Sequence, residues 1–179
     1  MKKADLLQVA MLGLSFAALL IVSMWSFGRA EDEAHVSAPP LPSFASRCDV
    51  SSEAAPERAR QADALAEADV ARYPFAPSDG LHALRELASA GGCHALLHEA
   101  ALAARAEHRA AIWRQRVERD YRDHAIRYER ASTEGHLALA SADIAFLLEL
   151  LSAHESSFTT QLRRQQLQLD AAPNPERKP

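Results

Sequence analysis

The chain has 179 residues, of which 48% are hydrophobic and 25% charged, and its 24 acidic and 20 basic residues give a formal net charge of −4. This slight acidity, together with aromatic residues that are not interleaved with the basic ones, argues against a nucleic-acid-binding surface. Alanine is the commonest residue and arginine far outnumbers lysine, which is typical of exported proteins from bacteria with GC-rich genes.

The first element that we expect is a membrane-spanning helix over residues 6–27, a run of 22 residues without a charge. At 1.5 Å per residue this helix would reach about 33 Å, enough to cross the hydrocarbon core of a bilayer. Lys2 and Lys3 precede the run and acidic residues follow it, so the N-terminal residues 1–5 are expected in the cytoplasm. The pattern predicts a single-pass signal anchor in the bacterial inner membrane, with the remainder of the chain periplasmic or extracellular.

Cleavage of this segment after export is the alternative, because Gly28 and Ala30 are small residues at the positions that a signal peptidase reads. The product would be a secreted, soluble helical protein that begins at Glu31. If the segment is retained, the cytoplasmic part is too short for a DNA-binding module or a kinase. The working part of the chain is therefore expected outside the cytoplasm.

Residues 28–51 form a proline-containing stretch that links this segment to the rest of the chain. Proline fixes φ, removes an N–H donor and pushes the preceding residue out of helical space, so we expect a disordered linker here. A single helical domain is expected over residues 52–170. Residues 171–179 contain three prolines and no apolar stripe, which predicts a disordered tail.

The domain is expected to be helical throughout, because Ala, Leu, Arg and Glu dominate it and β-branched residues are scarce. Prolines and glycines mark the breaks. The predicted helices cover residues 56–73, 79–90, 94–132 and 137–153, and a last one runs from Ser156 or Ser157 to about Leu169. The third carries apolar residues at spacings of three and four: Ala110, Trp113, Val117, Tyr121, Ala125, Tyr128 and Ala131.

These elements predict an all-α fold in which the membrane helix and the flexible linker lead to a four- to five-helix antiparallel bundle or a domain of helical hairpins. Residues 79–153 loosely resemble the tetratricopeptide repeat, with Gly135 and Gly92 laid on the inter-helix turns and Ala140 at the close-packing position. This resemblance implies a partner-binding scaffold without chemistry of its own. The two glycines are 43 residues apart, longer than the period of about 34 residues in that family.

Cys48 and Cys93 are the two cysteines of the chain. Outside the cytoplasm an even pair is readily oxidised, and a bridge here would pin the start of the domain to its middle. A buried Cys93 and a free Cys48 are the alternative.

His94 and His98 are four residues apart, so on one helix both imidazoles could face a single metal ion. The sequence nominates no third or fourth ligand. A short exported helical domain with histidines looks like the periplasmic metal-sensing and stress proteins of the helical-hook type, although their Leu-Thr-x-x-Gln motif is missing. A metal-responsive sensor is therefore the alternative function.

We expect no enzyme, no catalytic residue and no cofactor. Asp120 and His124 share a helix face and could form an acid–base pair, but a charged outer face opposite the Tyr121 stripe explains them better. The chain has no phosphate loop, nucleophile elbow, dinucleotide fingerprint or His-Glu-x-x-His signature.

The most consistent function is a membrane-anchored module that binds another protein outside the cytoplasm. A small-molecule substrate and a nucleic-acid partner are not expected. The candidate contact residues lie on the third helix, and we expect some of them to belong to the core: Trp113, Tyr121 and Tyr128.

Overall fold

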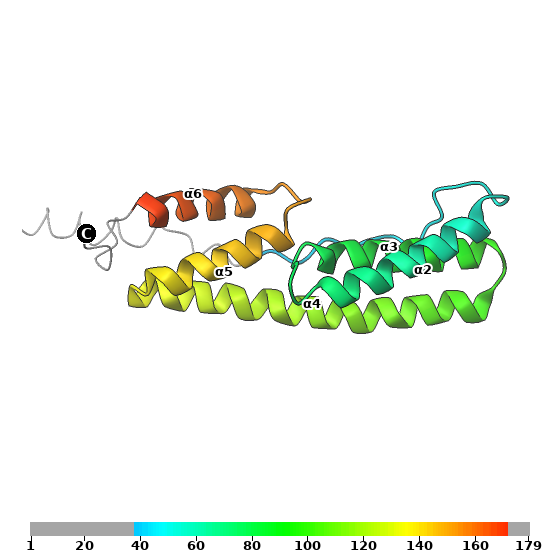
Figure 1. Cartoon of the computed structure of the whole chain (residues 1–179), viewed down its shortest axis with the longest axis horizontal. Helices are drawn as coiled ribbons and strands as arrows, with labels where there is room; N and C mark the ends of the chain where they lie inside the picture. The colour runs from blue at the N-terminus through cyan, green and yellow to red at the C-terminus, as the bar shows by residue number, and fades with distance from the viewer. Residues whose placement is uncertain (1–37, 172–179) are drawn as a thin grey trace, which may run out of the picture. The chain divides into compact units, whose positions relative to one another are not determined.

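The computed structural model describes residues 38–171, which contain five helices and no strand (Figure 1). The helices are α2 (Ala55–Arg72), α3 (Asp79–Leu96), α4 (Ala100–Glu134), α5 (Leu137–Leu150) and α6 (Ser157–Ala171). None of them is long and apolar enough to cross a membrane. The proposed spanning segment, residues 6–27, lies outside the described residues, as do the linker before residue 38 and the tail after residue 171.

The architecture consists of two helical hairpins beside one long helix. The hairpin α2–α3 lies along the N-terminal half of the 35-residue α4, and the hairpin α5–α6 lies along its C-terminal half (Figure 1). Each helix packs against the next one in the chain. The turns α2–α3 and α5–α6 therefore meet near the middle of α4, and this region is called the junction below.

The first hairpin packs closely because its contact residues are small. On α2 the spacing of four, three and four residues aligns Ala55, Ala59, Ala62 and Ala66 on one buried face. Ala62 meets Ala90 of α3 and Ala106 of α4. Such side chains lose little conformational entropy on folding and allow the helix backbones to approach one another.

Helix α3 is longer than the sequence predicts. It continues through Gly91 and Gly92, where a break was expected, and ends at Leu96. A Cβ atom on Gly92 would lie 2.4 Å from the backbone carbonyl carbon of Arg47, so this glycine allows another chain segment to cross the helix. Glycine here serves close packing and does not break the helix.

The remaining helix boundaries follow the expected breaks more closely. Helix α4 begins at Ala100, later than predicted, because His98 adopts a positive φ of 60° between α3 and α4. It runs unbroken to Gly135, whose left-handed conformation (φ 76°) ends it. Proline lies in the first turn of α2, as expected from its restricted φ.

Residues 38–50, called the strap below, correct the prediction of a disordered linker over residues 28–51. The strap has no regular secondary structure, but it packs on the helices and belongs to the same compact unit. Leu41 is only 8% exposed, and Arg114 Nη2 donates a hydrogen bond of 3.1 Å to the carbonyl oxygen of Pro42. Proline excludes helix but leaves apolar side chains and carbonyl groups free to pack, so the domain begins before residue 52.

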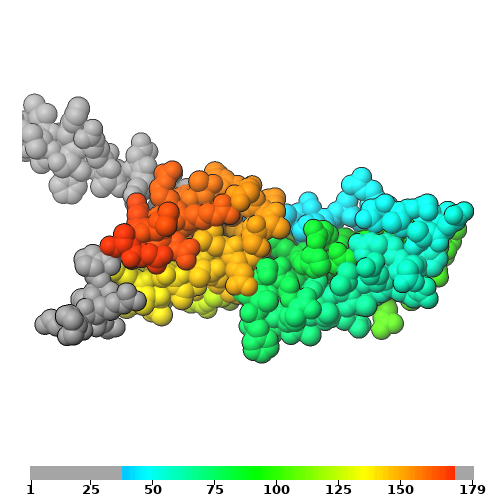
Figure 2. Space-filling view, turned by 45° about the horizontal axis from the view of Figure 1, so that its top comes forward, coloured from blue at the N-terminus to red at the C-terminus, as the bar shows by residue number. Residues whose placement is uncertain are grey.

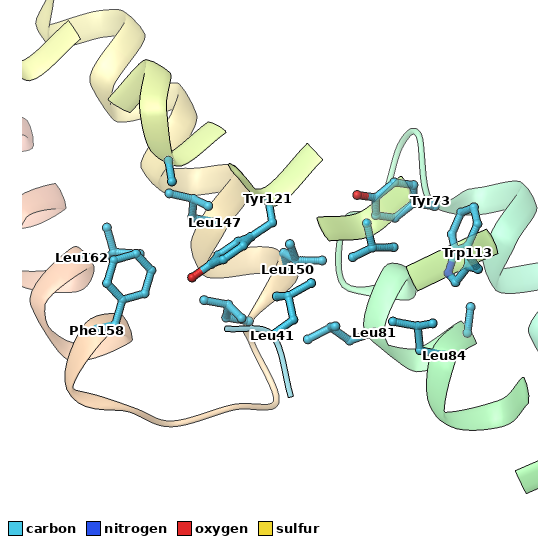
Figure 3. Close-up of a cluster of buried hydrophobic side chains, with 14 of the residues drawn as sticks. Leu41, Tyr73, Leu81, Leu84, Trp113, Tyr121, Leu147, Leu150, Phe158 and Leu162 are labelled. Carbon is cyan, nitrogen blue, oxygen red and sulfur yellow. The ribbon is translucent and has the colours of Figure 1, made fainter. Parts of the chain in front are cut away.

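One apolar core runs through both hairpins. Figure 3 shows Leu41, Leu81 and Leu150 in the junction. Two aromatic pairs flank them, one beside each hairpin. Tyr73 and Trp113 meet edge to face at 5.1 Å between ring centroids, and Tyr121 and Phe158 do so at 6.4 Å.

Candidate functional site

The candidate site is a recess of about 410 Å³ at the junction, which we call the junction groove. Four segments form it: the strap, the end of α2, the start of α3 and the chain that follows α5. On the face drawn in Figure 2, the orange chain after α5 adjoins the green of the first hairpin and the blue of the strap. The volume falls within the range of about 300–1,000 Å³ that is usual for ligand pockets.

Apolar side chains from all four segments line the groove: Phe44, Leu65, Leu81, Leu150 and Ala153. Leu81 and Leu150 are buried and belong to the core, whereas Leu65 is 36% exposed. The groove thus extends the core to the surface and leaves part of its apolar lining open to solvent. Such apolar surface is stabilised when a ligand covers it.

A buried carboxylate stands beside this lining. Asp69 is 1% exposed and contacts both the guanidinium of Arg72 and Nδ1 of His82. Arg72 Nε also donates a hydrogen bond of 2.7 Å to Asp79. Both carboxylates of the groove are thereby paired with cationic or hydrogen-bonding side chains, as a buried charge requires.

A second buried carboxylate, that of Glu86, lies on α3 one turn after His82. Glu86 accepts a charge-assisted hydrogen bond of 2.9 Å from Arg58 Nη1. Arg85 Nε lies 3.8 Å from the other oxygen of Glu86, beyond hydrogen-bond distance, and 55% of the Arg85 side chain is exposed. Within the described chain, the guanidinium of Arg85 forms no hydrogen bond. It lines the groove and is more than half exposed, with a long ion pair to Glu86.

Asp69 is not among the expected site residues, although the sequence contains a signal for it. Asp69 continues the buried alanine register of α2, three residues after Ala66, so it is an acid at a core position. A buried acid requires partners, and His82 on the next helix is one. The rest of the groove could not be predicted, because its residues come from four segments that only the tertiary fold brings together.

The structure separates the two predicted metal-ligating histidines. His94 lies in the last turn of α3, whereas His98 lies in the following turn, so they do not share a helix face. His94 Nδ1 is 2.7 Å from Glu99 and Nε2 is 3.2 Å from Asp63, so carboxylates occupy both ring nitrogens. Among residues 38–171, no group of three or more His, Cys, Asp or Glu side chains could hold a metal ion.

The predicted partner contacts lie mostly inside the domain. Trp113 and Tyr121 are 6% and 3% exposed, and Trp113 Nε1 donates a hydrogen bond of 3.0 Å to the carbonyl oxygen of Gly80. Tyr128 is partly buried against the core. The apolar stripe of α4 therefore faces the two hairpins, and its aromatic residues hold them in place instead of offering a surface.

His124 pairs with Asp143 of α5 and not with Asp120 of its own helix. Its Nδ1 is 2.7 Å from Asp143 on α5, and its ring stacks on Phe146 with 3.5 Å between centroids. Burial lowers the pKa of His124, and the positive charge of Arg127 adds to this effect, whereas the hydrogen bond that His124 donates to the Asp143 carboxylate opposes it. The side chain thus joins α4 to α5, and it borders a separate recess of about 220 Å³.

Cys48 of the strap and Cys93 of α3 form a disulfide. Cys93 is fully buried, and the bridge packs with Ala55 and Ala59 of α2. The bond joins the strap covalently to the first hairpin, and other residues of the strap form one wall of the groove.

No protein-family model matches the chain, and no curated protein or solved structure matches it at a significant level.

Proposed function

We propose that this protein is a membrane-anchored interaction module whose helical domain lies outside the cytoplasm and receives a segment of a partner protein in the junction groove. The groove is the observation that carries the proposal. It is concave, continuous with the core and partly apolar at the surface, and it has a charged edge, as binding sites generally do.

Two further features support this assignment. The disulfide between Cys48 and Cys93 is the kind of bond that persists in an oxidising compartment outside the cytoplasm. The uncharged run of residues 6–27, preceded by Lys2 and Lys3, has the length and flanking charges of an anchor with its N-terminus inside.

Site-specific photocrosslinking in living cells tests the groove. A photoreactive amino acid replaces Leu65, which lines the groove, in the full-length chain. The matched control carries it at Ile126, which is 63% exposed on α4 and does not line the groove. We expect adducts of defined mass from position 65 only, and we expect Ala153→Trp, which fills the groove, to abolish them.

Adducts of the same mass from both positions, or adducts that survive Ala153→Trp, would contradict the proposal. The anchor is tested separately by washing membranes with carbonate and weighing the chain. An intact mass in the washed membrane is expected, whereas a soluble chain beginning at Glu31 would show that the segment is removed.

A further inference from the structure

We infer that the junction groove recognises an acidic residue adjacent to a large apolar residue in an extended segment of the partner. This inference rests on the proposed function, because it names the chemistry of the segment that the groove receives. The apolar side chain covers the groove lining, and the carboxylate pairs with Arg85.

The charges of the groove give the first part of the argument. Asp69 and Asp79 are already paired, and Arg72 bridges both of them. The other arginine of the groove is Arg85, which is paired more weakly, through an ion pair of 3.8 Å with Glu86, and is 55% exposed. An entering group therefore meets paired carboxylates and an exposed guanidinium that is only weakly paired, and a guanidinium pairs best with a planar carboxylate.

His154 adds a second donor at the same groove. It lies in the exposed chain after α5 and lines the groove. A neutral imidazole donates one hydrogen bond from whichever ring nitrogen carries the proton. Arg85 and His154 come from opposite hairpins, so a carboxylate that contacts both would bridge the junction.

The apolar lining of the groove supports the apolar residue of the partner segment. Leu65 is 36% exposed, and Phe44 is only partly buried, so the groove presents apolar area that the chain itself does not cover. Burial of such area stabilises a complex by about 25 cal/mol per Å² before the costs of association. A volume of about 410 Å³ accommodates a few side chains and not a whole helix, whose diameter is about 10–12 Å.

A peptide library displayed on phage tests this inference on the purified full-length chain. Peptides that bind are sequenced, and the tightest one is synthesised with a fluorescent label, together with a version in which its acid is changed to the amide. We expect the selected peptides to share Asp or Glu beside Leu, Ile or Phe. The amide version is expected to bind about fivefold more weakly, as an exposed ion pair allows.

The variant Arg85→Gln identifies the pairing residue. In this variant the acid and amide peptides are expected to bind equally, because the lost interaction is the one that distinguished them. Arg119→Gln is the matched control, since Arg119 is an exposed arginine of α4 outside the groove, and it is expected to keep the fivefold difference.

The outcomes separate the inference from the function on which it rests. The inference would be overturned if the selected peptides contained no acid but failed to bind the variant Ala153→Trp. That outcome would leave the groove as a binding site. The inference would also be overturned if Arg85→Gln kept the same difference in affinity between the acid and the amide peptide as the wild-type chain. Failure to select any peptide that depends on the groove would overturn the proposed function as well.

Discussion

Cys48 and Cys93 join the strap to the middle of the first hairpin across 45 residues of sequence. The bridge lies beside the position where the strap crosses α3 at Gly92. The segment that leads from residue 37 into the domain is thus held both by packing and by a covalent bond.

Removal of the disulfide in the variant Cys48→Ala/Cys93→Ala is expected to reduce the free energy of unfolding by about 4 kcal/mol, the loop-closure entropy of a bridge that spans 45 residues. Urea denaturation followed by circular dichroism measures this change. The wild-type chain with a reducing agent provides the control and is expected to give the same midpoint. Equal stability of the oxidised and reduced chains would show that the bridge contributes nothing.

Gly92→Ala is expected to destabilise the domain by about 1–3 kcal/mol, because the new methyl group would overlap the backbone of Arg47 at 2.4 Å. Gly91→Ala is the matched control. Its nearest neighbour is the Ser46 hydroxyl at 3.2 Å, which can rotate away, and alanine improves helix propensity by about 1 kcal/mol. Thermal unfolding of both variants tests this, and an equal effect at the two positions would contradict the close crossing of the strap.

Asp69→Asn is expected to cost about 2 kcal/mol, because it removes the charge from a buried carboxylate that contacts Arg72 and His82. Glu57→Gln is the control. Glu57 and Arg60 form an ion pair three residues apart on the exposed face of α2, and such pairs contribute less than about 1 kcal/mol. Chemical denaturation measures the free energy of unfolding of both variants. Similar losses would show that Asp69 contributes no more to stability than an exposed ion pair does.

His94 and His124 are expected to make opposite contributions to the pH dependence of stability. Burial opposes the charge on His94, but hydrogen bonds and negative charges from Glu99 and Asp63 outweigh it and raise its pKa above 6.5. Its contribution is therefore present below about pH 6.5 and lost as pH rises through the folded value. His94→Gln is expected to cost more at pH 6 than at pH 8.

Because the pKa of His124 is lowered, its contribution to stability changes with pH in the opposite direction to that of His94. The folded domain favours the neutral ring, so this contribution is present above about pH 6.5 and is lost as pH falls through and below that value. His124→Gln is expected to cost more at pH 8 than at pH 5.5. Urea titrations of the two variants at these pH values would show parallel, and not opposite, trends if either assignment is wrong.

The helical class and most of the internal faces follow from local sequence. Residues such as Val117, Tyr121 and Ala125 recur at helical spacing and are buried in α4, because a 3.6-residue period places them on one face whatever packs against it. The breaks at Pro74 and Gly135 are also local, since each restricts or permits its own backbone conformation.

The course of the strap and the extent of α3 were decided by the tertiary structure. Proline at positions 39, 40 and 42 excludes a helix, but nothing local indicates that Leu41 enters the core of the junction. Two consecutive glycines read as a break because they disfavour a helix by about 1 kcal/mol each. In the fold, the close approach of the strap makes the absence of a side chain at Gly92 an advantage.

The sequence by itself determined which residues prefer helices and which faces of those helices are apolar, because both depend on the backbone and on neighbours three or four residues away. The tertiary structure alone decided that the apolar stripe of α4 packs against both hairpins, that His94 pairs with carboxylates, and that Leu65, Arg85 and His154 border one groove. These relationships join residues from separate segments of the chain, and a local pattern contains no information on which segments pack together.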